Sequence, residues 1–520
     1  MIRTVGITCL ALVGALSAAQ AQSSAIRRAA ESITAADVRR RIFVIAHDSM
    51  GGRATPSPGL TKTANYIAGE FQRFGLKPGG DSGTYLLKYP IYTKRLLAAQ
   101  SSVRFEAAGA QRVATTLGTG AALLFGPISK LARGEVALVG GVIVPDSIRA
   151  ADVKGRIVVL VPSAGDQRLT RVSLGALRRL NEAGAAGVVM VIAADSVFAE
   201  YARVQERTRT LVGDAASSGM PVLALLEQDI TVQVPEAAEQ FAQLRAAPVT
   251  VVQPMPDWSG EIALRDSTLG VSYAPDVVGI LEGSDPVLKH EYVVFSAHMD
   301  HIGTSGQPGA QCAATRTDRI CNGADDDASG TVGVVELAEA FSRPGARPKR
   351  SMIFLTVSGE EHDLWGSEWF VQHPPVPLPQ IVADLNADMI GRNWKDTIVA
   401  IGKEHSDLGS TLNRVNAAHP ELRMVAIDDR WPEESFYTRS DHYNFARSGV
   451  PILFFFNGVH DDYHRPSDAP DKIDAEKESR VVQLLFYLGQ EVGNAPERPK
   501  WRAESYYQIV VPNRLEPRER

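Results

Sequence analysis

Residues 292–300 read YVVFSAHMD, an apolar run that leads directly into His298 and Asp300. Residues 352–361, MIFLTVSGEE, have the same order and end in two glutamates. From Tyr273 to Gly493 such apolar runs alternate with amphipathic helical patterns, which is typical of a mainly parallel sheet covered by helices on both faces. The sequence therefore predicts a three-layer, doubly wound α/β domain whose polar residues gather at the carboxyl edge of the sheet.

The polar residues at these strand ends have the chemistry of a metal site. Imidazole and carboxylate groups are ligands that zinc takes at catalytic sites, and two ions held close together need a shared carboxylate. The candidate set is His298, Asp300, Asp326, Glu360, Glu361, Asp388 and His464. It offers enough ligands for two metal ions and a spare general base, so we interpret it as a two-metal hydrolase site.

His298 and Asp300 are two residues apart, so their side chains point to the same side of an extended strand end. A carboxylate commonly holds the second ring nitrogen of a metal-bound histidine, and Asp300 is suited to that task. A buried His–Asp pair with only a structural role is the alternative.

Residues 323–330, GADDDASG, place three adjacent acids before the helical pattern of Val332 to Phe341. One acid is enough to cap a helix, which is the alternative interpretation. Three adjacent carboxylates repel each other, and a pair of divalent ions would supply the compensating charge. We therefore predict that Asp326 bridges two ions and that Asp325 or Asp327 supports the turn.

Glu360 and Glu361 follow a predicted buried strand and a glycine. Adjacent side chains in extended geometry point to opposite sides, so one can bind metal while the other faces the substrate. The glutamate that faces the substrate would take a proton from an attacking water and return it to a leaving amine. An exposed surface pair is the alternative.

The order of these motifs resembles a known family. Asp388 ends the segment ADLNAD, and His464 lies in DDYHRPSD, after the apolar run Ile452 to Phe456. Together with His-x-Asp, Asp-Asp-Asp-Ala-Ser-Gly and Gly-Glu-Glu, they resemble the M28 zinc peptidases, also called the aminopeptidase Y or leucyl aminopeptidase-like family. The resemblance covers most of the chain after residue 21.

The resemblance implies a role for each motif residue. It makes His298 and Asp388 ligands of one zinc ion, Glu361 and His464 ligands of the other, Asp326 the bridge and Glu360 the general base. A cis peptide bond between Asp326 and Asp327 is also implied. Tyr463 matches a tyrosine that hydrogen-bonds the oxyanion in some members, and a packing role for its ring is the alternative.

The chain is long enough for two domains. Residues 22–98 and 256–498 are predicted to form the peptidase-like domain, and residues 99–255 an inserted, β-rich α/β domain with short Val/Ile/Leu runs. Val153 to Arg156 and Ala183 to Gly187 resemble motifs of the protease-associated domain. Residues 499–520 form a C-terminal tail with a strand-like stretch at 509–511.

The first 21 residues have the layout of a secretory signal. Arg3 precedes an apolar run, and Ala19-Gln20-Ala21 offers a cleavage site after residue 21. An uncleaved membrane anchor is the alternative, although the run is shorter than the ~20 residues that a span needs. In an exported protein, Cys312 and Cys321 are predicted to form a disulfide, with two free thiols as the alternative.

Composition narrows the class of partner. A net charge of −6 argues against nucleic acid as a partner. The sequence has no glycine-rich phosphate loop with an adjacent lysine, so it gives no support for nucleotide binding. We expect a secreted or periplasmic enzyme with two Zn²⁺ ions that removes N-terminal residues from peptides. The alternatives are a carboxypeptidase or dipeptidase of the same family, with Arg439 or Arg465 as carboxylate-binding residues, a glutaminyl cyclase, or a non-catalytic, receptor-like binding protein.

Overall fold

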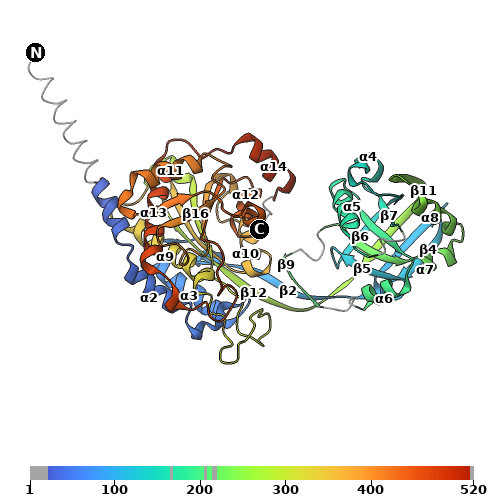
Figure 1. Ribbon diagram of the computed structural model, residues 1–520, viewed down its shortest axis with the longest axis horizontal. Helices are drawn as coiled ribbons and strands as arrows, with labels where there is room; N and C mark the ends of the chain where they lie inside the picture. Colours follow the sequence, from blue (N-terminus) through green and yellow to red (C-terminus); the bar gives the residue numbers. More distant parts are fainter. Residues whose placement is uncertain (1–21, 164–167, 204–207, 214–218, 516–520) are drawn as a thin grey trace, which may run out of the picture. The chain divides into compact units, whose positions relative to one another are not determined.

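The computed structural model describes residues 22–163, 168–203, 208–213 and 219–515. The chain forms two compact units (Figure 1): unit 1 runs to Tyr89 and resumes at Tyr273, and unit 2 is Pro90–Ser272. The predicted signal segment, residues 1–21, lies outside the described residues. The chain passes between the units within two long strands, β2 (Leu86–Leu96) and β12 (Asp266–Leu281).

The expected domain boundary at residue 255 falls inside a strand, β11 (Val251–Leu264). Pro254 and Pro256 interrupt the strand pattern in the sequence. In the structure the pairing of β11 with its neighbour shifts register between Met255 and Ser259, and such an irregularity accommodates proline within a sheet. The structure therefore extends unit 2 to Ser272.

Unit 1 is built on a mixed sheet with a parallel centre. In the order β17-β16-β18-β15-β13-β14-β12, strands β14, β13, β15 and β18 are mutually parallel neighbours, whereas β12 and β16 pair antiparallel to β14 and β18. Their bounds are β13 Tyr292–His298, β14 Ser351–Val357, β15 Ile381–Ala387, β16 Thr397–Ile401, β17 Val425–Ile427 and β18 Ile452–Phe456. The mainly parallel α/β fold predicted from the sequence is confirmed.

Helices cover both faces of this sheet. Val294 and Ile353 pack with Phe370 and Phe445 of one helical layer, whereas the adjacent residues Phe295 and Phe354 contact Phe341 of the other layer. Successive strand residues point to opposite faces, so the unit has three layers. One layer contains α2 (Ala35–Ile45), α3 (Pro58–Arg73), α9 (Gly330–Ser342), α11 (Leu408–Ala418) and α13 (Ala475–Asn494); the other contains α10 (Trp365–Gln372), α12 (His442–Arg447) and α14 (Ala503–Asn513).

The start of α9 lies against the end of β15. A Cβ atom on Gly330 would be 2.1 Å from the carbonyl oxygen of Ala387, so only glycine permits this approach. The approach brings the acidic turn before α9 next to the residue that follows β15, which is Asp388.

A buried ion cluster joins three helices of unit 1. Arg41 on α2 lies 3.0 Å from Glu70 on α3 and 2.5 Å from Glu339 on α9, and it also pairs with the buried Glu336. Burial raises the pKa of Glu336 to about 7, although Arg41 opposes this shift. Removing the arginine would leave buried carboxylates without their partner.

We expect Arg41→Met to lower the free energy of unfolding of unit 1 by about 3–5 kcal/mol, as breaking one side of a buried ion pair does. Urea denaturation measures this change. The control is Arg40→Met, because Arg40 pairs with Asp37 on the exposed side of the same helix and should change stability little. Equal effects of the two substitutions would contradict the assignment of the buried cluster.

Unit 2 is a second, separate α/β body. Its sheet has the order β4-β3-β11-β6-β7-β8-β10-β5, in which β6, β7, β8 and β10 are parallel, and one buried apolar cluster lies on each face. The strands are β3 Ser102–Ala107, β4 Ala110–Thr116, β5 Ala121–Phe125, β6 Lys130–Gly140, β7 Ile157–Val161, β8 Gly187–Ile192 and β10 Val222–Leu226. The helices are α4 Ala150–Val153, α5 Arg171–Glu182, α6 Asp195–Ala202, α7 Glu227–Gln233 and α8 Ala237–Ala246.

The C-terminal tail differs from the prediction. Residues 509–511 are not a strand but lie within α14, where Val510 is buried. Ile509, Trp501 and Leu515 pack against the apolar cluster formed by β14 and the helices α10 and α12, and the Trp501 indole donates to the carbonyl oxygen of Gly449. Packing on one face of a helix thus overrides the β propensity of the Ile-Val-Val stretch.

Among the described residues, no helix has the length and apolarity that a membrane crossing requires.

Candidate metal centre

The predicted site residues meet at one edge of the unit 1 sheet. Each lies at the carboxyl end of a parallel strand or in the turn before α9, as the strand pattern predicted. His298 ends β13, Glu360 and Glu361 follow β14, Asp388 follows β15, His464 lies in the loop after β18, and Asp326 lies in the turn before α9.

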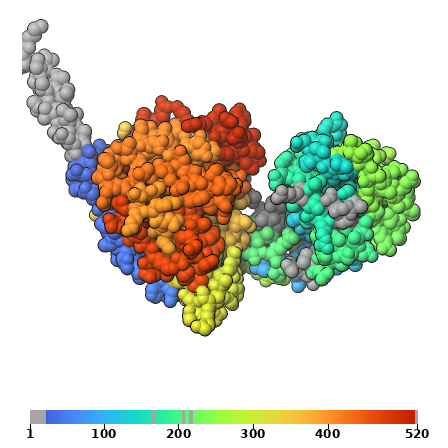
Figure 2. Space-filling view, in the orientation of Figure 1, coloured from blue at the N-terminus to red at the C-terminus, as the bar shows by residue number. Residues whose placement is uncertain are grey.

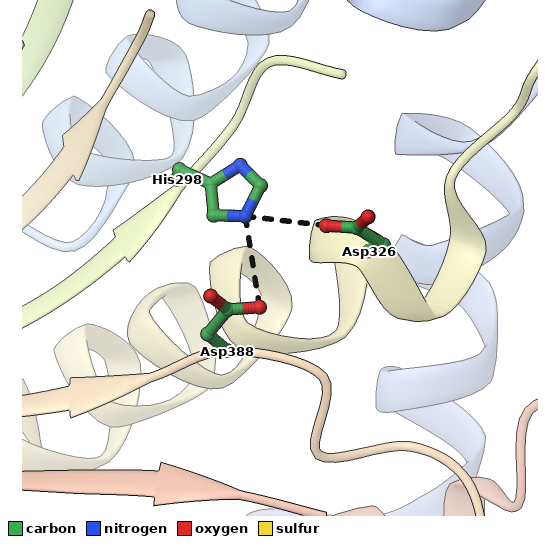
Figure 3. A group of neighbouring side chains, drawn as sticks. All are labelled: His298, Asp326 and Asp388. Atoms are coloured by element: carbon green, nitrogen blue, oxygen red, sulfur yellow. Dashed lines mark ion pairs between the residues drawn. The ribbon is translucent and has the colours of Figure 1, made fainter. Parts of the chain in front are cut away.

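A first cluster contains His298, Asp326 and Asp388 (Figure 3). The Nε2 atom of His298 lies 3.3 Å from Oδ1 of Asp326 and 3.6 Å from Oδ1 of Asp388. Donor atoms at about 2.0–2.1 Å from one tetrahedral zinc ion are about 3.3 Å apart, so the three side chains have the spacing of ligands to a shared ion.

A second cluster lies on the other side of Asp326. The Nε2 atom of His464 is 3.2 Å from Oδ2 of Asp326 and 3.2 Å from Oε2 of Glu361. Because Oδ1 of Asp326 faces the first cluster and Oδ2 the second, this carboxylate has the placement of a bridge between two ions.

The second cluster includes a residue that sequence analysis missed. His301 lies with its Nδ1 atom 2.7 Å from Oε1 of Glu361 and 3.6 Å from Oδ2 of Asp326. His301 directly follows Asp300 in the loop after β13. Its closeness to His298 in the sequence was the signal that could have pointed to it.

Several buried donor atoms of the clusters make no hydrogen bond within the described part of the chain. They are Nδ1 of His298, both ring nitrogens of His301, Oδ2 of Asp326 and Oε1 of Glu361. Buried polar atoms nearly always have a partner, and a set of unpartnered nitrogens and carboxylate oxygens facing one another fits bound cations.

The electrostatics agree with a need for positive charge. Burial alone raises the pKa of Asp326, but His301, His298 and His464 hold it well below its usual range. The pKa of Glu361 is lowered to about 2 against the effect of burial, and the same carboxylates raise the pKa of His464 to about 10, again against burial. Divalent ions would meet this demand without protonated histidines.

Glu360 belongs to neither cluster but lines the same cleft as His298, Asp326 and Asp388. Burial raises its pKa well above the usual range, and the charges of Glu361 and Asp388 add to this effect while His298 opposes it. Its side chain therefore lies in the cleft outside both ligand groups, where a general base would have to be.

Asp300 connects the two halves of the site. Its Oδ2 accepts hydrogen bonds from the backbone N–H of Gly359 at 2.7 Å and from the Thr55 hydroxyl at 2.8 Å. Its Oδ1 accepts from the N–H of Glu360 at 3.3 Å and lies 3.6 Å from Nδ1 of His298. Asp300 thus faces His298, as predicted, and also fixes the turn that carries Glu360.

The neighbours of Asp326 support the turn rather than either cluster. Asp327 accepts from the backbone N–H groups of His298, Gly330 and Met389, and Asp325 accepts from the N–H of Gly391 at 2.7 Å. Both acids therefore take the supporting role that the sequence offered to one of them. The Asp326–Asp327 peptide bond is cis, as the resemblance implied.

Arg53 is a second support that the sequence did not single out. Its guanidinium is fully buried and donates to the backbone carbonyl oxygens of Met299, Ile45, Asn322 and Gly323. It therefore ties the loop after β13 to the segment that leads into the acidic turn.

Tyr463 lines the cleft, and its ring stacks on the imidazole of His464 with centroids 3.9 Å apart. This position gives it both the packing contact and the access to the cleft that the two interpretations require. The oxyanion role remains a prediction.

Ser440 donates to Asp388 at 2.8 Å, whereas Nε2 of His442 faces the carbonyl oxygen of Tyr437, so these neighbours do not form a nucleophilic triad.

Part of the cleft wall is apolar. Met389, Phe436, Phe454, Phe456 and Val459 form this apolar wall, and Arg439 and Ser440 line the cleft together with the polar residues of the site. Sequence analysis did not identify these apolar residues, because aromatic residues in strands and turns usually belong to a core.

The predicted disulfide between Cys312 and Cys321 is present, with an S–S distance of 2.08 Å. The disulfide closes a loop between the segment that contains His298 and the turn that contains Asp326. In Figure 2 the yellow segment that contains this loop projects from the surface of unit 1.

Comparison with known proteins finds similarity to a peptidase family. Residues 276–489 match the family described as "Peptidase family M28". A probable leucine aminopeptidase of Arthroderma otae is 26% identical over 229 residues, which are 42% of this chain and 58% of that protein. A probable glutamate carboxypeptidase of Arthroderma benhamiae is 32% identical over 209 residues, 36% of this chain and 24% of that protein.

Among solved structures, the aminopeptidase from Aneurinibacillus sp. strain AM-1 aligns with 95% of this chain and 100% of its own at 16% identity, with a TM-score of 0.46. The chain spans little more than half the length of the leucine aminopeptidase that it matches.

Proposed function

We propose that this chain, whose residues 276–489 match peptidase family M28, is a dizinc exopeptidase that removes N-terminal residues from peptides. The observation that carries the proposal is the position of Asp326, whose two oxygens face two separate groups of ligands, with Glu360 free beside them. The match to a probable leucine aminopeptidase supports the aminopeptidase reading.

The residues would divide between the two ions as follows: His298 and Asp388 at the first, Glu361 and His464 at the second, and Asp326 shared. Zinc ions held there would lower the pKa of water and polarise a carbonyl oxygen. Hydrolysis needs a metal ion with one coordination position left open for water.

Glu360 is the general base in this proposal. It takes a proton from the attacking water and then gives it to the amine that leaves. Asp300 is a positioning residue, since its hydrogen bonds fix the backbone of Gly359 and Glu360. The hydroxyl of Tyr463 would stabilise the developing oxyanion, and the apolar wall of the cleft would take an apolar side chain next to the scissile bond.

The proposal also includes export of the enzyme and an identity for unit 2. The pattern of residues 1–21 and the Cys312–Cys321 disulfide support a secreted or periplasmic enzyme. We infer that unit 2 is a protease-associated domain, on the motif resemblance and its β-rich α/β fold.

A carboxypeptidase is the second candidate, because Arg439 lies beside the apolar wall and guanidinium groups bind carboxylates well. The match to a probable glutamate carboxypeptidase points the same way. Arg465, the other arginine considered, is exposed and is not part of the cleft wall.

The test is a time course by mass spectrometry on a defined peptide mixture, half of it N-acetylated. We expect residues to be lost one at a time from free N-termini only, fastest where the N-terminal side chain is apolar. Trimming from the C-terminus of acetylated and free peptides alike would replace the proposal by the carboxypeptidase. Loss of 17 Da without cleavage, as in cyclisation of N-terminal glutamine, or no turnover with metal bound, would also overturn it.

A further inference from the structure

His301 occupies a place in the site that the motif resemblance does not explain. Its side chain is fully buried, and neither ring nitrogen makes a hydrogen bond to the residues that the structure describes. The ring lies against Gly323, which has a φ of +55°, and a Cβ atom there would be 2.5 Å from Cγ and Cδ2 of the imidazole. The fold therefore keeps space for this ring beside the metal clusters.

The contacts of Nδ1 are those of a metal ligand. It lies 2.7 Å from Oε1 of Glu361 and 3.6 Å from Oδ2 of Asp326, and these distances bracket the separation of about 3.3 Å expected for donors around one tetrahedral zinc ion. The 2.7 Å contact is short enough for a hydrogen bond, but among the described residues neither Nδ1 nor Oε1 has a partner in hydrogen-bonding geometry. Nδ1 and Oε1 are therefore close together, but their angle is not that of a hydrogen bond.

The rest of the second cluster leaves this position to His301. Oε2 of Glu361 faces His464, while Oε1 faces His301. The two imidazole rings meet edge to face, with centroids 5.6 Å apart and an angle of 75°, so they approach the carboxylates from different sides. Two imidazoles and two carboxylates thus surround the same space.

We propose that Nδ1 of His301 is an additional ligand of the second metal ion, which then has His301, His464, Glu361 and Asp326 as protein ligands. The inference rests on the proposed two-metal function. The first ion keeps three protein ligands and an open position, as catalytic zinc sites do, whereas the second has the four that closed sites have. The two ions are therefore unequal: the second binds more tightly and exchanges more slowly.

Metal affinity gives the first readout. Protein freed of metal and titrated with Zn²⁺ should bind two ions in the wild type, whereas His301→Gln should lose affinity for one of them by more than about 100-fold. Loss of a residue that only orients a ligand costs about 10–100-fold, so a larger effect is required. The control is His419→Gln, because His419 stacks on Tyr487 beside Glu421, away from the site, and should bind both ions as the wild type does.

A cysteine at position 301 separates direct binding from orientation. Its sulfur is nearer the backbone than Nδ1, but the zinc–sulfur bond, about 2.3 Å, is longer than the zinc–nitrogen bond. Titration of His301→Cys with Co²⁺ should produce a thiolate-to-cobalt charge-transfer band in the near ultraviolet, and His419→Cys should produce none. Protein produced from residue 22 onward lacks Cys9 and has no other free thiol, because Cys312 and Cys321 are bonded to each other.

Wild-type metal affinity in the glutamine variant, or two bound cobalt ions without the band in His301→Cys, would overturn the inference. X-ray absorption of the unaltered two-zinc protein is an independent check that needs no variant: we expect three imidazoles shared by two ions, and two would contradict us. A wild type that binds no metal refutes the proposed function itself, whereas a two-metal peptidase without the band refutes only the role of His301.

Discussion

Replacing Glu360 by glutamine is expected to lower kcat at least about 100-fold while leaving both metal ions bound. Glutamine keeps the size of the side chain but cannot accept a proton from water, and removal of a general base costs about 10²–10⁴-fold in rate. The measurement is steady-state hydrolysis of an N-terminally free peptide, together with zinc content by mass spectrometry.

The adjacent residue provides the matched control. Glu361 lies in the second cluster, with its oxygens facing His301 and His464, so Glu361→Gln should lose zinc as well as rate. Near-normal hydrolysis by the Glu360 variant would remove that residue from the base role. Loss of zinc from the Glu360 variant would instead place it among the ligands.

The second large effect is expected at Asp326. Its two oxygens face the two clusters, at 3.3 Å from His298 and 3.2 Å from His464, so Asp326→Ala removes a ligand from both ions at once. We expect loss of two-ion binding and a fall in kcat/KM on the order of 10³-fold or more, because bound metal supplies several kcal/mol of transition-state stabilisation.

Asp325→Asn is the control for this experiment. Asp325 is the preceding acid of the same turn, but its Oδ1 accepts from the N–H of Gly391 and its Oδ2 faces His460, away from both clusters. This variant should retain two zinc ions. An Asp326→Ala protein that still binds two ions, as measured by calorimetric titration, would show that Asp326 is not the bridge.

Much of the site was predictable because its chemistry lies at strand ends. The apolar runs before His298 and Glu360 are β13 and β14, and the parallel arrangement of these strands brings their ends to one edge. Likewise, the Val/Ile runs at 157–161 and 187–192 are β7 and β8. Local pattern was sufficient wherever a residue's position followed from its strand.

What the sequence missed depends on contacts between distant segments. His301 meets Glu361 only where the segments after β13 and β14 come together, and Phe436 joins the cleft wall from a short turn with no periodic pattern. The Ile-Val-Val stretch at 509–511 is helical because it packs on the layer that contains α12. Tertiary packing decides such cases, and local propensity does not.

In the proposed site, two metal ions lie on either side of Asp326. The most direct test is anomalous diffraction at the zinc edge from crystals of protein purified without chelators. We expect two peaks about 3.5–4 Å apart, one near His298 and Asp388 and one near Glu361 and His464. A single peak, or none, would contradict the two-metal site and the peptidase mechanism built on it.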